Sequence, residues 1–132
     1  MKKISLKIFN KAESFKVPSL KMKRVFGVFL ERYGRLLKTC EVSIIFVKKN
    51  EMKSLNERWK GGSGATDVLS FDYGEIYICP DVADKYRKDY GTTIVEEILF
   101  LFVHGLLHIA GFTHENEKKF AIMMKKTEEI LK

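Results

Sequence analysis

The chain has 132 residues, of which 45% are hydrophobic and 31% are charged, and its formal net charge is +7 with a pI of about 9.4. These values are typical of one folded globular domain with a real core, and they argue against a disordered, fibrous or membrane-embedded chain. The positive charge favours polyanionic partners such as RNA, although many small basic proteins bind no nucleic acid.

The first half of the chain is predicted to alternate strands and helices. Residues 3–9 alternate apolar and polar side chains, which predicts a strand. Pro18 and Ser19 are expected to open a helix that reaches about residue 37, because its apolar positions recur at helical spacing. Residues 41–48 are rich in β-branched side chains and predict a second strand, and a short helix should follow over residues 51–59.

A glycine-rich loop follows at residues 60–65, and it lacks the pattern of a phosphate-binding P-loop. Strands are predicted over residues 67–73 and 75–79. Pro80 is then expected to begin a helix that ends at Gly91.

Thr93 and Glu96 form the pattern of a capping box, which predicts the start of a helix that runs to about Ala110. This helix is apolar on nearly every side, so it should be the central element of the core. A last amphipathic helix over residues 117–131 is expected to bury five side chains: Phe120, Met123, Met124, Ile130 and Leu131. The irregular order of elements predicts an α+β fold, a single domain over residues 1–132 in which a small mixed sheet packs against helices.

No apolar run follows the two N-terminal lysines, and the most apolar stretch, residues 98–112, is too short to span a bilayer. We therefore expect no signal peptide, no membrane contact and a cytoplasmic location. Cys40 and Cys79 belong to no C-x-x-C pair, which excludes a zinc ribbon, and we expect both to be reduced and buried.

All three histidines of the chain lie within residues 104–114. His104 and His108 are four residues apart, so a helix places them on one face, and Gly111 would let the chain return with His114. A lone histidine on an apolar helix is usually a core residue, but two buried imidazoles need polar partners, and a shared metal ion satisfies both. We expect one divalent ion, most simply zinc, with nickel, copper or iron also suited to imidazole ligands.

Three nitrogen ligands leave a fourth position open for water, which is typical of a catalytic rather than a structural zinc site. The spacing of the three histidines is that of the metzincin proteases, which carry a glutamate base directly after the first histidine. Gly105 occupies that position here. The missing glutamate argues against a peptidase but does not exclude one, since a base can come from elsewhere in the chain.

At these residues the chain resembles the YbeY family of bacterial endoribonucleases. The family signature is close to H-G-x-L-H-L-x-G-Y-D-H, and residues 104–114 are HGLLHIAGFTH. A second family block, N-x-x-[aromatic]-R-G followed by T-D-V-L-S-F, is matched by residues 56–61 and 66–71. Gly74-Glu75-Ile76 matches a family strand start, and the last helix resembles the family at Met123 or Met124 and at Glu128. The resemblance covers residues 55–128.

The chain departs from the family pattern at several positions. Thr113 replaces an aspartate before the third histidine, Lys60 replaces a functional arginine, and Ala65 replaces a proline. Lysine keeps the charge of arginine but loses its two-pronged contact with phosphate. The segment between Phe71 and Gly74 is also shorter than is common in the family.

The resemblance implies a zincin-like α+β domain with metal-dependent endoribonuclease activity on single-stranded RNA, acting in maturation of small-subunit ribosomal RNA and in ribosome quality control. Ribosomal proteins and a ribosome-associated GTPase are the implied protein partners. Lys60 or Arg58 is expected to neutralise the scissile phosphate, and Lys60 and Trp59 to bind substrate, with Trp59 stacking on a base. For these three residues, solvent exposure or packing on the sheet is the alternative, and Asp67 and Ser70 are expected to be structural.

Two other functions stay open. One is a different metallohydrolase, such as a degenerate peptidase. The other is a non-catalytic ribosome assembly factor whose metal only stabilises the fold.

Overall fold

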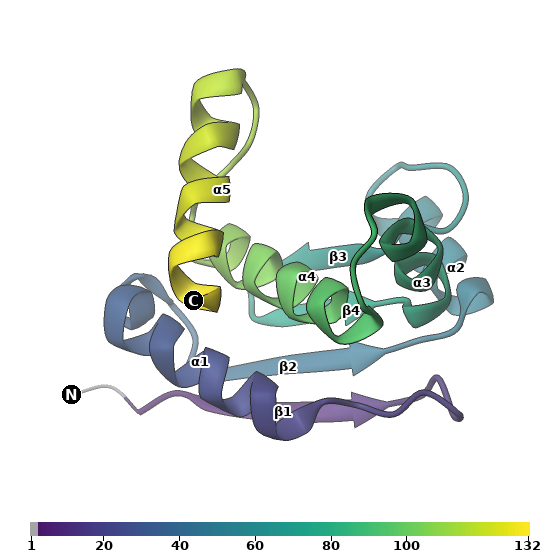
Figure 1. Ribbon diagram of the computed structural model, residues 1–132, viewed down its shortest axis with the longest axis horizontal. Helices are drawn as coiled ribbons and strands as arrows, with labels where there is room; N and C mark the ends of the chain where they lie inside the picture. Colours follow the sequence, from purple (N-terminus) through teal and green to yellow (C-terminus); the bar gives the residue numbers. More distant parts are fainter. Residues whose placement is uncertain (1–2) are drawn as a thin grey trace.

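A four-stranded mixed sheet organises the molecule, which was analysed as a computed structural model that describes residues 3–132 (Figure 1). The strand order is β1-β2-β4-β3. β1 and β2 are parallel, β2 and β4 are parallel, and β3 runs antiparallel to β4 and forms one edge. The elements are β1 Ser5–Asn10, α1 Ser19–Tyr33, the 3₁₀ helix η1 Gly34–Leu36, β2 Glu41–Phe46, α2 Lys49–Trp59, β3 Val68–Phe71, β4 Glu75–Ile78, α3 Pro80–Tyr90, α4 Ile94–Ile109 and α5 Glu117–Leu131.

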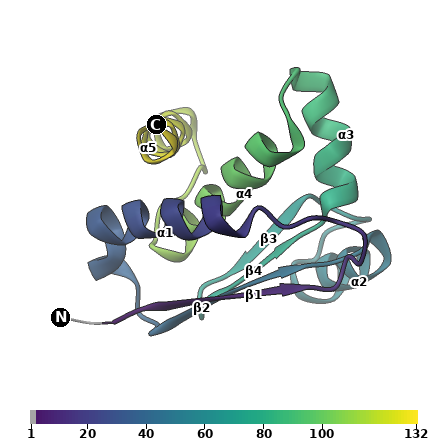
Figure 2. The same cartoon turned by 60° about the horizontal axis from the view of Figure 1, so that its bottom comes forward.

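Helices cover both faces of the sheet (Figure 2). Alternate strand residues point to opposite faces. One face, with Ile44 opposite Ile76 in the register, packs against α1 and α4 in the main core. The other face, with Ile45 opposite Tyr77, forms a smaller cluster with Met52 of α2. The sheet therefore separates a large core that contains α4 from a small one beneath α2.

α4 is the central helix, because nine of its residues are buried. Ile98, Phe102 and Leu106 are completely inaccessible to solvent. Full burial of an aliphatic or aromatic side chain stabilises a fold by roughly 1.5–3 kcal/mol. This helix is thus held firmly against β3, β4, α1, α3 and α5.

The α+β fold and the order of its elements are as the sequence predicted, although most elements are shorter than expected and α2 begins two residues earlier, at Lys49. The first helix ends at Tyr33 rather than near residue 37, because η1 takes over at Gly34. The expected burial of Phe120 was wrong: its side chain is 49% exposed. Phe120 lies in the first turn of α5, and Figure 1 shows that this end of the helix rises away from the sheet.

The two cysteines are free, but only Cys79 is buried, so the predicted burial of Cys40 was wrong. Cys40 lies directly before β2, where its carbonyl accepts a hydrogen bond from the N–H of Ser5 and its side chain faces solvent. Among residues 3–132, no single helix has both the length and the apolarity to cross a membrane. α3 and α4 meet those criteria only as a pair bent by 111°.

Candidate metal centre

The start of α4 is fixed by the predicted capping box. The N–H of Glu96 donates to Thr93 Oγ1 over 3.1 Å, and the N–H of Thr93 donates to Glu96 Oε1 over 2.9 Å. Because α4 is regular from this cap to Ile109, His104 and His108 lie one turn apart on the same face.

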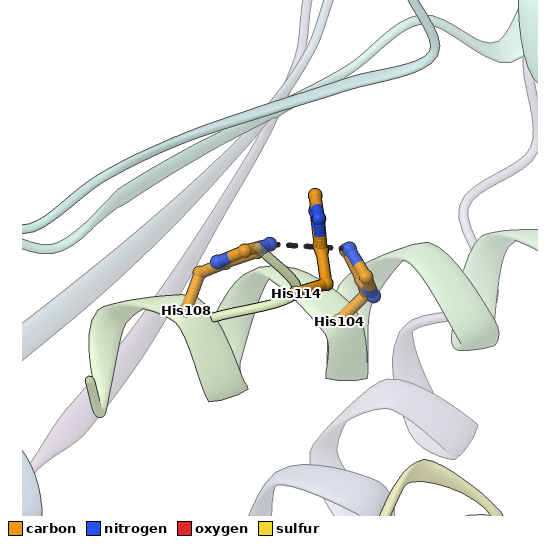
Figure 3. Close-up of side chains that lie close together, drawn as sticks. All are labelled: His104, His108 and His114. Atoms are coloured by element: carbon orange, nitrogen blue, oxygen red, sulfur yellow. Dashed lines mark hydrogen bonds between the residues drawn. The ribbon is translucent and has the colours of Figure 1, made fainter. Parts of the chain in front are cut away.

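The third histidine reaches the same place after a reversal of the chain. Gly111 has φ +107°, a conformation that L side chains rarely adopt. The segment after it carries His114, and Asn116 then caps α5 by accepting a hydrogen bond from the N–H of Lys119. Figure 3 shows the three imidazole rings gathered above α4, and their ring centres lie 4.7, 4.8 and 5.4 Å apart.

The distances suit a shared ion. One ring nitrogen from each histidine lies within 4.8 Å of those of the other two. The Nε2 atoms of His104 and His108 are 3.2 Å apart (dashed line in Figure 3). Two tetrahedral Zn–N bonds of ~2.0–2.1 Å place their nitrogens ~3.3–3.4 Å apart, so the observed spacing fits the donor set of a zinc ion.

Burial favours the neutral form of His104 and His108, which is the form that binds metal. Burial, and then the neighbouring His108 and His114, lower the pKa of His104 to about 4. Burial also lowers the pKa of His108, with contributions from His114 and Lys60, against an opposing hydrogen bond to the backbone of Phe112.

His104 Nδ1 is the one buried side-chain nitrogen or oxygen within residues 3–132 that has no hydrogen-bond partner. An unsatisfied buried polar ring is costly. A cation bound at Nε2 would fix Nδ1 as an N–H donor that still lacks an acceptor, so the convergence of the three rings, rather than this atom, suits a metal ligand at His104.

The histidines open into a cavity of about 690 Å³ between α4 and the edge strand β3. Its wall includes Lys60 from the end of α2, two carboxylates and the whole of β3. The lining residues are Lys60, Asp67, Val68, Leu69, Ser70, Phe71, Asp72, His104, Gly105, His108, Ile109 and His114. The charged wall is therefore mixed, with one lysine and two carboxylates beside the histidines.

Comparison with known proteins identifies the family. The family model described as "Endoribonuclease YbeY" matches residues 7–132, which is nearly the whole chain. The chain belongs to the YbeY family.

Its relatives differ in how much they share with it. A protein of Thermotoga neapolitana named endoribonuclease YbeY is 40% identical over 93 residues, which cover 67% of this chain and 62% of the relative. One from Thermodesulfovibrio yellowstonii is 30% identical over an alignment of 150 positions, covering 96% and 94%. The solution structure of TM1509 from Thermotoga maritima matches with a TM-score of 0.64 and 28% identity, covering 95% of this chain and 88% of that one. The chain spans less than two thirds of the length of the Thermotoga relatives that it matches.

Within this YbeY family fold, the predicted site residues lie in three different places. Lys60 lies in the wall of the histidine cavity, where its Nζ donates to the carbonyl of Ser70 over 2.8 Å and sits 4.6 Å from the centre of the Phe71 ring. Trp59 is 63% exposed and lines a neighbouring hollow instead. Arg58 is exposed on α2 and lines neither of these two hollows.

Three acidic residues in or near the cavity were not predicted as part of the site. Burial raises the pKa of Asp67 in the cavity wall, although hydrogen bonds from the N–H of Val68 and from Thr66 oppose the shift. Asp72 is an exposed member of the same wall. Glu97 is 7% exposed in the first turn of α4, and burial together with the charge of Asp67 raises its pKa. The family block that contains Asp67 was the only signal in the sequence for any of the three.

Proposed function

We propose that this chain is a metal-dependent endoribonuclease that cleaves single-stranded RNA through an ion held by His104, His108 and His114. One observation carries the proposal: three imidazoles converge on one point of an open cavity whose wall also carries Lys60. A divalent ion bound there would supply electrostatic stabilisation for charge that develops on the phosphate. The names of the relatives, each an endoribonuclease YbeY, support the same activity.

The surrounding residues have roles that follow from their positions. The Lys60 ammonium has three N–H donors, and only one is used by the Ser70 carbonyl, so two can face a phosphate in the cavity. Its placement by Ser70 and by the Phe71 ring limits the entropy lost when it binds an anion. The net charge of +7 draws a polyanion to this surface over a longer range.

Gly105 has no side chain with which to activate water, which weakens the peptidase alternative more than the nuclease one. An RNA strand carries its own nucleophile in the 2′-hydroxyl group, whereas a peptide does not. Asp67 and Asp72 are the carboxylates in the cavity wall that could accept a proton.

We place this activity in the cytoplasm, in maturation and quality control of small-subunit ribosomal RNA, with ribosomal proteins and a ribosome-associated GTPase as partners. This part of the proposal is supported by the family resemblance and by the basic charge. A strain that lacks the protein should accumulate precursor ribosomal RNA. The wild-type chain should reverse that defect, and His108→Ala should not.

The direct test compares wild-type protein and His108→Ala, purified in parallel to control for contaminating ribonuclease. We expect close to one zinc or other divalent ion per wild-type chain by metal analysis, and cleavage of single-stranded RNA that a chelator stops and added ion restores. His108→Ala should lose both the ion and the cleavage. A peptide panel should remain uncut.

Cleavage that survives in metal-free His108→Ala would show that the activity does not belong to this centre. A clean preparation that binds precursor ribosomes but cuts no RNA at any metal loading would support the assembly-factor alternative instead. Peptide hydrolysis would support the other metallohydrolase.

A further inference from the structure

A second hollow, of about 430 Å³, lies beside the histidine cavity and is lined almost wholly by aromatic rings. Leu55 and Trp59 come from α2, Tyr77 from β4, Phe71 from the end of β3 and Tyr73 from the turn between the two strands. A volume of this size is in the range of small-ligand sites, which span roughly 300–1,000 Å³.

The rings of this hollow are held in place before any ligand binds. The hydroxyls of Tyr73 and Tyr77 both donate to Glu75 Oε1, over 2.8 and 3.1 Å. Phe71 stacks on Tyr73 with ring centres 5.6 Å apart and meets Tyr77 edge-on at 5.8 Å. Because both hydroxyl protons are donated to Glu75, the apolar contact groups of this hollow are ring faces, and the indole N–H of Trp59 adds one polar donor.

Two of these rings are open to water. Trp59 is 63% exposed and Tyr73 is 61% exposed, and they lie on the rim of the same hollow. Clustered exposed aromatic rings are unfavourable in water and commonly mark a binding surface. Flat apolar ring faces suit a flat, aromatic ligand.

The hollow adjoins the proposed RNA site, with Phe71 as the shared wall. Phe71 lines both cavities, and Lys60, the residue after Trp59, lines the histidine cavity with its ammonium over the Phe71 ring. A phosphate beside Lys60 and the histidines therefore has an aromatic hollow next to it. In single-stranded RNA the neighbour of a phosphate is an unpaired base, which proteins commonly stack on aromatic side chains.

We propose that the hollow formed by Leu55, Trp59, Phe71, Tyr73 and Tyr77 binds one unpaired nucleobase of the RNA strand next to the phosphate held in the histidine cavity. The identity of the ligand rests on the proposed ribonuclease function. Recognition through ring faces tolerates any base, since each has a π-face, so the site selects unpaired over paired nucleotides rather than a sequence. Glu75, which accepts hydrogen bonds from both tyrosine hydroxyls, places a carboxylate beside the hollow and disfavours a second phosphate there.

The chain contains a single tryptophan, and it lies in this hollow, so its fluorescence reports on the site directly. The first ligand is a short single-stranded RNA whose 2′-O-methyl groups block attack by the 2′-hydroxyl. The second is a series of the same oligomer in which one nucleotide, at a different position in each member, lacks its base. The other two ligands are adenosine monophosphate and ribose 5-phosphate. We expect saturable quenching by the oligomer and by adenosine monophosphate, and none by ribose 5-phosphate. In the shortest oligomer that still binds, where the strand cannot shift its register, one abasic position should remove the quenching and weaken binding by about 5- to 150-fold, the effect of losing one stacked base.

Tyr73→Ala should weaken oligomer binding over the same range, and Tyr73→Phe should recover most of that loss because the ring is restored. Tyr90→Ala removes another exposed tyrosine, 72% accessible at the end of α3 and outside both cavities, and should bind as wild type. Circular dichroism of each variant separates lost binding from lost folding.

The measurement also separates this proposal from the ribonuclease proposal. Quenching by RNA that persists in His108→Ala, which should not cut, supports the base site independently of cleavage. If the wild-type protein cuts RNA but neither an abasic position nor Tyr73→Ala changes affinity, the base site is refuted and the nuclease stands. Quenching by apolar peptides but not by RNA or adenosine monophosphate would refute it in favour of a protein partner.

Discussion

Gly105 lies against Ile76 so closely that a Cβ at position 105 would stand 3.0 Å from Ile76 Cγ2. The other two nearest atoms, Cδ1 and Cγ1 of the same isoleucine, would be 3.1 and 3.2 Å away. α4 therefore approaches β4 more closely than a larger residue would permit. This approach sets the depth at which His104 and His108 lie beside β3.

Gly105→Ala should destabilise the fold by about 1–3 kcal/mol, the usual cost of overpacking a core. Urea unfolding measures the loss. Ile76→Val alone should cost about 0.5–1.5 kcal/mol, but in the double variant it removes a methyl group from the crowded contact, so the two costs should not add. Strictly additive costs would mean that α4 shifts away from β4 and that the cost of Gly105→Ala does not depend on the side chain of Ile76.

The turn after α4 gives a second prediction. Gly111→Ala places a Cβ at φ +107°, which should cost about 1–3 kcal/mol of backbone strain. Because the same turn directs His114, metal affinity should fall together with stability. Isothermal titration with zinc checks the affinity. Gly27→Ala, in α1 with no atom within 4 Å of the new Cβ, is the matched control and should bind metal normally.

Glu97 gives a prediction about pH. Its folded-state pKa is raised, first by burial and then by Asp67, so near that pKa the folded state holds more protons than the unfolded state. Stability contributed by this group is thus present in acid and lost as the pH rises through the raised pKa. Glu97→Gln removes the charge and should raise the urea midpoint at neutral pH, with the gap narrowing on acidification.

Glu31→Gln on α1 serves as the control for removing an exposed carboxylate by the same substitution. A Glu97→Gln variant less stable than wild type at neutral pH would contradict the prediction. It would indicate that the ionised carboxylate makes a favourable contact.

Helix α4, which carries His104 and His108, could be predicted from sequence because its signals are local. The Thr93–Glu96 cap, the apolar run and the spacing of the histidines all lie on one continuous segment. The nearness of Asp67 to Glu97 could not be predicted, since it depends on how β3 packs against α4. Phe120 was misplaced for a related reason: helical periodicity shows which face is apolar, but not where the helix extends beyond the body.

The same limit applies to the aromatic hollow. Trp59 stood out because it is the only tryptophan and lies beside the glycine-rich loop. Its neighbours Tyr73 and Tyr77 gave no signal, because only the folded β3–β4 hairpin brings them to the end of α2.

Metal removal should lower stability by mass action. With free ion at 100 times its dissociation constant, binding to the folded state adds about 2.7 kcal/mol. Addition of a chelator should therefore lower the unfolding midpoint of the wild-type protein, as followed by circular dichroism. His108→Ala should show the same midpoint with and without chelator. An equal fall in both proteins would place the stabilising ion elsewhere.

Lys60 should contribute to RNA binding through phosphate rather than through a base. Lys60→Ala should weaken binding about equally for all sequences and reduce the slope of log K against log salt by roughly 0.7, the value for one phosphate of a single strand. Lys60→Arg should restore the slope, and Lys53→Ala, an exposed lysine on α2, should leave it unchanged. Fluorescence anisotropy over a salt series gives all four slopes.

The three histidines differ in how firmly the surrounding structure holds them. His104 and His108 are half-buried on one packed helix, whereas His114 is exposed on the segment that joins it to α5. An ion bound by all three would cross-link the segment before the C-terminal helix α5 to helix α4. Protease cleavage between residues 111 and 116 would then report whether the ion is bound. Cleavage should be slow in the metal-bound protein and fast in the metal-free protein. Loss of the ion and loosening of the C-terminal helix would then occur together.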